Sequence, residues 1–230
     1  MPPKPKTHLV VLSGAGMSAE SGIPTFRGAN GLWENHRIED VASPAAWAKN
    51  RELVLRFYNE RRKRMWECAP NEGHRGLVEL EQQFDVTIVT QNVDNLHERA
   101  GSTRLLHLHG ELTKSRSTLD PHLVYKIDGW ELKLGDRCAR GSQLRPHIVW
   151  FGEAVPMMET AIETLQTADI LVIIGTSLNV YPAASLIDFA PTGARVFLID
   201  PAPPAISDER IHVIRSGAGE GVKQLRQMLT

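Results

Sequence analysis

The sequence has little cysteine and no long hydrophobic run. Only Cys68 and Cys138 occur among the 230 residues, which is too few for a disulfide framework and favours a reducing compartment such as the cytoplasm. No apolar stretch has the length of a transmembrane helix, and the opening Met-Pro-Pro-Lys-Pro-Lys contains no hydrophobic export signal. We therefore expect a cytoplasmic protein that has no membrane partner.

An excess of charge of one sign is also missing. The chain has 26 Lys and Arg against 27 Asp and Glu, a formal net charge of −1. General binding of nucleic acids needs a clustered excess of basic residues, so we expect no specific nucleic-acid partner. Residues 61–64 form one basic cluster, which a solvated helix face explains. The length and the 42% hydrophobic content predict one substantial core with room for a smaller domain, and we expect a monomer.

The first apolar run, residues 8–12, leads into a glycine turn. Residues 14–19 read Gly-Ala-Gly-Met-Ser-Ala, a G-x-G-x-x-A pattern that is typical of turns that bind a dinucleotide phosphate. A plain tight turn explains the glycines about equally well. The next residues, 21–27, break any helix and add an aromatic residue and an arginine, which a purely structural turn does not need.

Three further apolar runs end in polar residues or glycine. They are contained in residues 85–94, 168–177 and 195–200. Continuous apolar strands are typical of parallel sheets covered on both faces, and such sheets bind ligands at the carboxyl ends of their strands. The pattern predicts an α/β fold with a doubly wound, Rossmann-like parallel sheet. Asp94 also has a structural explanation, as the cap of the short helix that Gly101 closes.

Residues 43–67 are predicted to form one long helix, with Ser43 as its N-cap before Pro44. Tyr58 and Arg61 stand three residues apart on an otherwise apolar face of this helix, so the phenol and the guanidinium project in the same direction. On spacing alone, the favoured explanation is an arginine whose stem packs along the helix while its charge reaches solvent.

Residues 105–109 are predicted to form a short strand that carries His107 and His109. Because side chains alternate along a strand, both histidines face the same side, and their spacing does not choose between them. A satisfied core histidine explains either residue. As a catalytic base, imidazole suits cytoplasmic pH because its ordinary pKa is about 6.5.

Asp128 and Gly129 lie between alternating apolar residues, a strong signal for a two-residue β-hairpin turn. Each apolar pair across such a hairpin adds up to about 1 kcal/mol of stabilisation beyond burial. The predicted pairs, all on one face, are Ile127 with Trp130, Tyr125 with Leu132, and Leu123 with Leu134.

Five blocks of the sequence, in their order along the chain, together resemble the sirtuins, the NAD-dependent protein deacylases. The first is residues 14–27, Gly-Ala-Gly-Met-Ser-Ala-Glu-Ser-Gly-Ile-Pro-Thr-Phe-Arg. The others are residues 90–94, 109–110, 146–153 and 175–182. The resemblance covers nearly the full chain, and its motifs are too long for coincidence.

Two domains are expected. A Rossmann-like NAD-binding domain would consist of residues 1–34, 73–112 and 143–230. The two insertions, residues 35–72 and 113–142, would pack together as a smaller domain, with NAD in the cleft between the two.

The resemblance implies three groups of site residues. The catalytic group is His109, as general base, with Asn92 and Asp94 at the nicotinamide end of NAD. The cofactor-binding residues lie in the strand-end turns and the loops beside them: Gly14, Ala15, Gly16, Ala19, Glu20, Thr25, Phe26, Arg27, Trp33, Gln91, Asn92, Asp94, Gly175, Thr176, Ser177, Asn179, Asp200 and Ala218. The residues implied for the acylated lysine and its peptide are Tyr58, Arg61, Val149, Phe151, Gly152, Glu153 and Val180.

Tyr58 and Arg61 resemble the Tyr-x-x-Arg motif of the sirtuin class that removes acidic acyl groups. A guanidinium holds a carboxylate through two hydrogen bonds, and the tyrosine hydroxyl adds a third. The resemblance therefore implies a preference for succinyl and malonyl chains, although family members with this pair also remove acetyl groups.

The sequence departs from the family in two places. Most sirtuins bind zinc through two Cys-x-x-Cys pairs in the region that matches residues 113–142, where this chain has only Cys138. We expect no zinc, and we expect the apolar hairpin to replace the folding energy that the metal would supply. Many sirtuins have an asparagine near Leu198 for the adenosine end, and Asp200 could receive a ribose hydroxyl instead.

The implied function is NAD-dependent removal of acyl groups from lysines of proteins or peptides, which yields nicotinamide and O-acyl-ADP-ribose. Two alternatives remain: a protein mono-ADP-ribosyltransferase and a non-enzymatic NAD sensor. The presence of His109 speaks against a sensor, which needs no base. A hydride-transferring dehydrogenase is disfavoured, because no strand ending in an acid follows the first glycine turn within about 20 residues.

Overall fold

The computed structural model describes residues 6–25, 32–33, 36–204 and 209–229, and the structural statements below concern these residues. Of the expected site residues, Phe26 and Arg27 lie outside this set. For Trp33 only the backbone is described, in the short strand β2 (Leu32–Trp33) that pairs with β3 (His36–Arg37). No helix in the described ranges is long and apolar enough to span a membrane.

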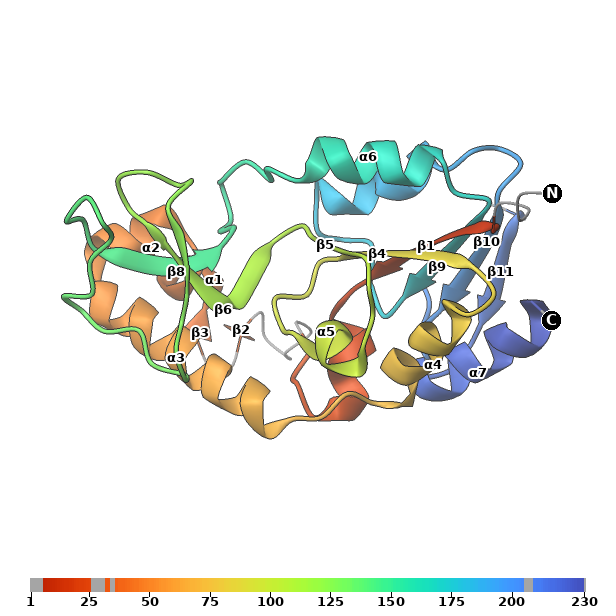
Figure 1. Ribbon diagram of the computed structural model, residues 1–230, viewed down its shortest axis with the longest axis horizontal. Coiled ribbons are helices and arrows are strands. Elements are labelled where there is room, and N and C mark those ends of the chain that lie inside the picture. The colour runs from red at the N-terminus through yellow and green to blue at the C-terminus, as the bar shows by residue number, and fades with distance from the viewer. Residues whose placement is uncertain (1–5, 26–31, 34–35, 205–208, 230) are drawn as a thin grey trace.

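A six-stranded parallel sheet forms the centre of the larger part of the molecule (Figure 1). Its order is β11-β10-β9-β1-β4-β5, so the strand order reverses beside β1, as in a doubly wound α/β fold. The predicted fold class is confirmed. The strands are β1 (His8–Ser13), β4 (Asp85–Thr90), β5 (Leu105–His107), β9 (Ile170–Ile174), β10 (Arg195–Ile199) and β11 (Ile211–Ile214).

Helices cover both faces of this sheet (Figure 1). On one face, α4 (Glu72–Leu80) and α7 (Ala218–Leu229) pack against alternate residues of the strands, such as Val11 and Val172. On the other face, α6 (Met158–Gln166) and the 3-10 helix η2 (Ala183–Phe189) cover the remaining alternate residues. Because both faces are covered, β9 is apolar and buried along its whole length.

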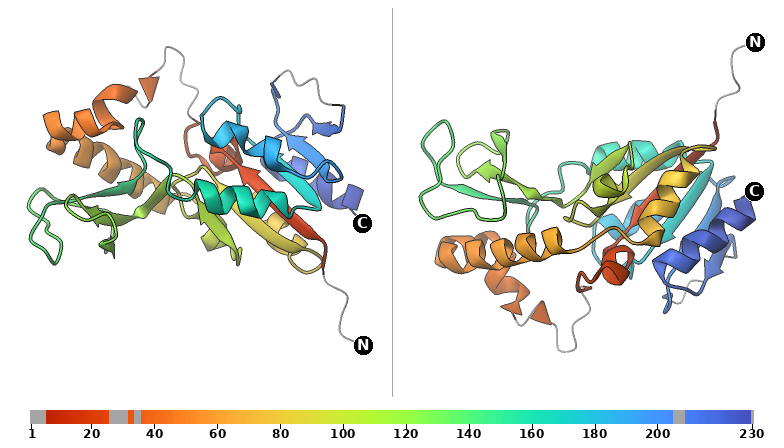
Figure 2. Two further views of the ribbon diagram at one scale, coloured as in Figure 1. Left: turned by 90° about the horizontal axis from the view of Figure 1, so that it is seen from above. Right: turned by 60° about the horizontal axis from the view of Figure 1, so that its bottom comes forward.

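The smaller part lies beyond the carboxyl ends of these strands (Figure 2). A three-stranded antiparallel sheet in the order β7-β6-β8 packs with three helices around its own core, which includes Phe57, Tyr58 and Trp150. The sheet draws on residues on both sides of the expected boundaries at 112 and 143. Its elements are α1 (Ile38–Val41), α2 (Pro44–Lys49), α3 (Arg51–Glu67), β6 (Gly110–Ser117), β7 (Val124–Lys126) and β8 (Leu144–Ile148).

The single helix predicted for residues 43–67 is wrong, because the chain forms two helices that meet at Asn50. Ser43 caps the first helix as expected, accepting a hydrogen bond from the Ala46 N–H. Asn50 has a non-helical backbone and caps the second helix, since its side-chain oxygen accepts the Leu53 N–H at 3.0 Å. An asparagine cap competes well with helix continuation, and helical periodicity alone does not reveal it.

The hairpin predicted around Asp128 and Gly129 is also wrong. A type I′ turn needs a positive φ at both central residues; Gly129 has a φ of 75°, but in the described part of the chain Leu178 is the only non-glycine residue with a positive φ. Residues 124–126 pair instead with β6, and the Ile127 N–H donates to the Thr113 carbonyl. Trp130 is consequently 41% exposed rather than paired across a hairpin.

Two side chains of α3, Asn59 and Arg62, hydrogen-bond to residues 130–132, which were expected to form the second strand of the hairpin. Asn59 brackets Leu132, donating to its carbonyl at 2.9 Å and accepting its N–H at 3.0 Å. The fully buried Arg62 guanidinium donates to the Trp130 carbonyl, to the Leu112 carbonyl and to the Asn59 side chain. This corrects the interpretation of residues 61–64 as a solvated face, because Arg61 and Arg62 are both buried.

Candidate functional site

A cavity of about 510 Å³ lies where the two parts of the molecule meet, a volume typical of small-molecule sites. One side, which we call the strand-end wall, comes from the segments that follow β1, β4, β9 and β10, namely residues 14–20, 91–94, 175–177 and 200–202. The opposite side, the α3 wall, comes from Tyr58, Arg61, Arg64 and Met65 and from residues 148–153.

The glycines of the strand-end wall allow two turns to pack against each other. A Cβ on Gly14 would lie 2.8 Å from the Gly175 oxygen and from the Thr176 Cβ, and one on Gly16 would lie 2.6 Å from the Gly175 Cα. Gly175 itself has a φ of 60°. The close approach brings Gly14, Ala15, Gly16 and residues 175–177 to one edge of the cavity, at the reversal point of the sheet.

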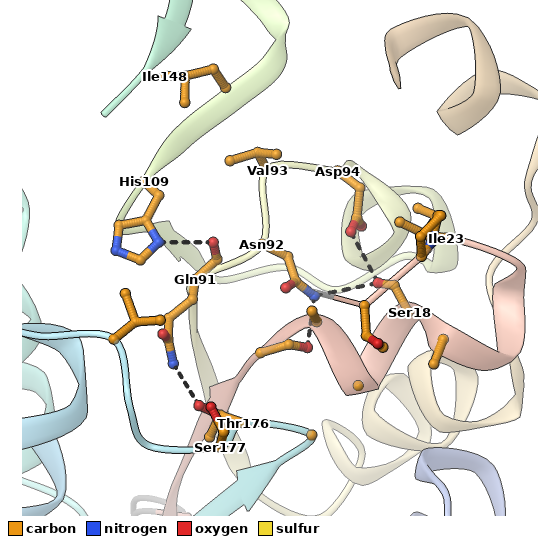
Figure 3. Close-up of a pocket in the computed structure, with 18 of the residues that line it drawn as sticks. Ser18, Ile23, Gln91, Asn92, Val93, Asp94, His109, Ile148, Thr176 and Ser177 are labelled. Carbon is orange, nitrogen blue, oxygen red and sulfur yellow. Dashed lines mark hydrogen bonds between the residues drawn. The ribbon is translucent and has the colours of Figure 1, made fainter. Parts of the chain in front are cut away.

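A hydrogen-bonded group of three side chains lies at the centre of the strand-end wall (Figure 3). The Asn92 amide donates to the Gly14 carbonyl at 3.0 Å and to the Ser18 hydroxyl at 3.3 Å. Ser18 in turn donates to the Asp94 carboxylate at 3.0 Å, whose other oxygen accepts the Leu96 N–H. The N-cap of α5 (Leu96–Ala100) is Asn95 rather than Asp94, although Asp94 accepts the first N–H of that helix. Burial raises the pKa of the Asp94 carboxyl group.

His109 projects from the segment after β5 towards the same cavity (Figure 3). Its Nδ1 lies 3.1 Å from the Gln91 carbonyl oxygen, an acceptor, so Nδ1 carries the proton and Nε2 is left as the acceptor in the neutral ring. Burial lowers the pKa of this imidazole, which keeps the ring neutral at physiological pH. The Gln91 side chain donates to the Thr176 hydroxyl at 3.1 Å and so joins the turns after β4 and β9.

The structure separates the two histidines that sequence spacing could not. β5 ends at His107, so strand alternation does not extend to His109. His107 contacts the Asn92 carbonyl through Nδ1 at 3.1 Å and Glu98 through Nε2 at 2.8 Å. Burial lowers the pKa of His107, but the Glu98 carboxylate outweighs it, and the pKa lies above its ordinary value. His107 thus forms an ion pair beside the cavity rather than lining it.

Tyr58 and Arg61 lie together on the α3 wall. Tyr58 is fully buried, and its hydroxyl oxygen accepts the Trp150 indole N–H at 3.1 Å. Burial raises the pKa of the phenol above its ordinary value, so it remains protonated. The Arg61 guanidinium carbon lies 5.5 Å from the centre of the Phe57 ring, and Met65 lies one turn further along the same helix face. The wall therefore presents a phenol and a buried guanidinium to one end of the cavity.

Residues 149–153 complete the α3 wall. The Val149 N–H donates to the His109 carbonyl at 2.9 Å, which links this segment to the one that carries His109. Gly152 has a φ of 88° and reverses the chain, and Phe151 is 46% exposed at the rim. The Glu153 carboxylate accepts from Arg145, from Arg116 and from the Trp150 backbone N–H.

Most of the expected site residues line the cavity, but two do not. Asn179 is exposed outside it, and Ala218 is buried in the core at the start of α7. Glu20 lines the cavity while its carboxylate accepts the Gly219 N–H, near the N-terminus of α7. Asp200 lines it as well, with one carboxylate oxygen accepting the Ala202 N–H at 2.8 Å, and Leu198 is fully buried in the core.

Sequence reasoning did not select several residues of the cavity wall, among them Ser18, Trp150, Met65 and Arg64. Ser18 lies inside the first glycine motif, and Trp150 lies between two residues that were selected. Met65 and Arg64 follow Arg61 by four and three residues, so helical spacing alone could have placed both near it. Side chains inside a motif were overlooked wherever the resemblance assigned them no role.

A zinc site of four thiolates is impossible with two cysteines in the sequence. Within the described ranges, the one cluster with three potential metal ligands is Glu98, His107 and Glu111. Each already has a partner, because Glu98 contacts His107 and Glu111 pairs with Lys114 at 2.6 Å.

Comparisons with a protein family, with known sequences and with solved structures agree with one another. The model of the Sir2 family matches residues 14–182. A protein of Bacteroides thetaiotaomicron named NAD-dependent protein deacylase is 57% identical over 228 residues, which covers 96% of this chain and 97% of that one. A crystal structure of a Sir2 homologue in complex with NAD superposes with a TM-score of 0.86 at 38% identity, covering 98% of this chain and 91% of that chain. A mutant Sir2 homologue in complex with 2′-O-acetyl ADP ribose has a TM-score of 0.85 at 38% identity, covering 98% and 94%.

Proposed function

This chain belongs to the Sir2 family, and from that premise we propose that it is an NAD-dependent protein deacylase that removes succinyl and malonyl groups as well as acetyl groups from lysine. Its products would be nicotinamide and O-acyl-ADP-ribose. The observation that carries the proposal is a single cavity lined both by the imidazole of His109 and by the Tyr58 and Arg61 pair.

The strand-end wall suits a dinucleotide. It lies at the reversal point of a doubly wound sheet, its two glycine turns pack so closely that backbone rather than side chains borders the cavity, and Asp200 stands after β10. The turns after β1 and β9, with Gln91, would hold the phosphates and a ribose, while Asp200 would accept a hydroxyl of the adenosine ribose. Residues 14–20, 91–94 and 175–177 would thus form most of the NAD site.

Bound NAD supplies a ribose carbon that becomes electrophilic as its bond to nicotinamide weakens. Asn92 and Asp94 would orient the nicotinamide, and the hydrogen bonds from Asn92 to Gly14 and from Ser18 to Asp94 fix both side chains in place. Both oxygens of Asp94 already accept a hydrogen bond, and burial raises the pKa of this carboxyl group.

His109 would act as the general base. Its Nδ1–H is held by the Gln91 carbonyl, so the free Nε2 would be available to take a proton from a ribose hydroxyl of NAD and so make that oxygen nucleophilic towards the acyl group. Because burial lowers the pKa of His109, the ring is in its basic form at neutral pH. The His107 ion pair has no such free nitrogen and would support the Asn92 backbone instead.

The α3 wall would select the acyl group. The Arg61 guanidinium and the Tyr58 hydroxyl would together donate hydrogen bonds to the terminal carboxylate of a succinyl or malonyl chain. Val149, Gly152 and Val180 would bind the peptide backbone as an added strand, which leaves side-chain specificity slight. The NAD-binding domain would be built around the six-stranded sheet and the smaller domain around the three-stranded sheet, in a protein that we expect to be a cytoplasmic monomer without zinc.

Mass spectrometry of succinyl-lysine and acetyl-lysine peptides, with and without NAD, tests this function. We expect both peptides to lose their acyl group only when NAD is present, with one nicotinamide released per peptide. The same reactions analysed by intact-protein mass would reveal transfer of ADP-ribose to the protein. Nicotinamide release accompanied by a protein mass increase and unchanged peptides would overturn the deacylase proposal in favour of ADP-ribosyl transfer.

A further inference from the structure

Trp150 connects a buried ion pair to the acyl-selecting tyrosine. Its indole ring is 2% exposed and lies against the Arg145 guanidinium, whose carbon is 3.2 Å from the ring centre. The indole N–H donates to the Tyr58 hydroxyl at 3.1 Å. No expectation from the sequence gave Trp150 a role.

The ion pair behind the ring is rigidly built. Arg145 donates to Glu153 through both terminal nitrogens, at 2.6 and 3.0 Å, and to the Ile148 carbonyl at 2.9 Å. Glu153 also accepts the Trp150 backbone N–H at 2.8 Å and an Arg116 nitrogen at 3.0 Å. Burial raises the pKa of Glu153, but the hydrogen bond from Arg145 outweighs it and the carboxylate stays ionised. Both the backbone and the ring of Trp150 are thereby fixed.

The chemistry of the two groups determines which way the hydrogen bond runs. An indole N–H can only donate, whereas a hydroxyl donates one hydrogen bond and accepts others. Tyr58 must therefore be the acceptor from Trp150, and its own proton must point elsewhere. Tyr58 and Arg61 both line the cavity, so a ligand group that lies between them can receive this proton.

We propose that Trp150, fixed by the pair of Arg145 and Glu153, is a positioning residue for acidic acyl groups: it occupies the acceptor side of the Tyr58 hydroxyl and so directs the phenolic proton at the acyl carboxylate. This inference rests on the proposed acidic-acyl preference. An acetyl group has no carboxylate to receive that proton, so Trp150 contributes little to its binding. Misdirecting a hydrogen bond to a carboxylate, without removing it, weakens binding by roughly three- to tenfold, less than its full loss would.

The test is a double-mutant cycle between Trp150→Phe and Tyr58→Phe, with KM and kcat measured on succinyl- and acetyl-lysine peptides. Phe keeps a ring over Arg145 but removes the N–H. We expect Trp150→Phe to raise KM for the succinyl peptide about threefold or more and to change KM for the acetyl peptide less than about twofold. In the Tyr58→Phe background the same change should have no further effect, because the group it positions is gone.

Trp47→Phe is the matched control. Trp47 belongs to the same core, with its ring centre 5.8 Å from that of Trp150, so its replacement repeats the loss of an indole without touching Tyr58. Equal KM changes for the two peptides, or additive effects of Trp150→Phe and Tyr58→Phe, would overturn the positioning role. If Tyr58→Phe alone leaves the succinyl KM unchanged, the acidic-acyl preference itself has failed, and the inference fails with it.

Thermal unfolding shows whether Trp150→Phe is folded. Should it not be, Glu153→Gln carries the same test, because it loosens Arg145 behind the ring and leaves every aromatic side chain in place. The expected result is an increase in succinyl KM of roughly twofold that is absent in the Tyr58→Phe background. A change of the same size in both backgrounds would contradict the proposal.

Discussion

The two walls of the cavity are built differently. The strand-end wall consists of turns that directly follow buried strands, and neighbouring turns hold its functional side chains, as when Asn92 donates to Gly14. The α3 wall depends on buried arginines whose partners are distant in sequence, such as Arg62 with the Trp130 carbonyl. Turns at the ends of parallel strands thus build the wall proposed for NAD, whereas buried arginines of the smaller part support the wall proposed for the acyl group.

The difference predicts that substitutions in the two walls have different consequences. Replacing a residue that serves the cofactor chemistry should lower the activity on every acyl substrate equally. A residue of the α3 wall should affect either the stability of the smaller part or the choice of acyl group. Substitutions in each wall therefore test this contrast.

His109→Ala should abolish the proposed chemistry for every acyl group. Loss of a general base lowers kcat by about 100-fold or more, and the loss should be the same for succinyl and acetyl peptides. Steady-state kinetics on both peptides measure this. His107→Ala is the control, because His107 contacts Glu98 and does not line the cavity. Its replacement should lower kcat far less. A larger loss in the His107 variant would exchange the roles of the two histidines.

Arg62→Met should destabilise the protein by about 3 kcal/mol, because it removes the hydrogen bonds to the buried Leu112 carbonyl and to the Trp130 carbonyl and one of the two donors to the Asn59 oxygen. Denaturant unfolding measures the loss. Trp130→Ala is the matched comparison, and we expect it to cost less than about 1 kcal/mol because its ring is 41% exposed. The reverse order would restore the apolar hairpin as the element that stabilises this region.

A fall in pH should lower the free energy of unfolding because of His74. This residue is fully buried, and its ring centre lies 4.8 Å from that of His97. Burial lowers the pKa of His74 to about 4, so below pH about 6.5 the unfolded chain binds a proton that the folded chain does not. Stability should fall by roughly 2 kcal/mol between pH 6.5 and pH 5. The same pH shift should cost less in His74→Gln, which keeps the N3 capping interaction with Asn71. An unchanged pH dependence in this variant would rule out His74.

The strand-end wall was largely predictable from sequence, whereas the support of the α3 wall was not. Apolar runs that end in glycine or polar residues locate the turns after β4 and β9, because parallel strands place their carboxyl ends at one edge. Helical spacing placed Tyr58 beside Arg61. Nothing local in the sequence indicates that Asn59 and Arg62 would hold residues 130–132, since those contacts join segments about 70 residues apart. The failed hairpin prediction has the same origin, because pairing with β6 overrode the local turn signal.

The ratio of desuccinylation to deacetylation in Arg61→Met tests the central claim most directly, with Arg64→Met as a control on the same helix and the same cavity. If the α3 wall selects the acyl group independently of the NAD chemistry, Arg61→Met lowers kcat/KM for the succinyl peptide about tenfold more than for the acetyl peptide. Arg64→Met should leave this ratio unchanged. Equal losses on both peptides in Arg61→Met would contradict the assignment of acyl selection to the α3 wall.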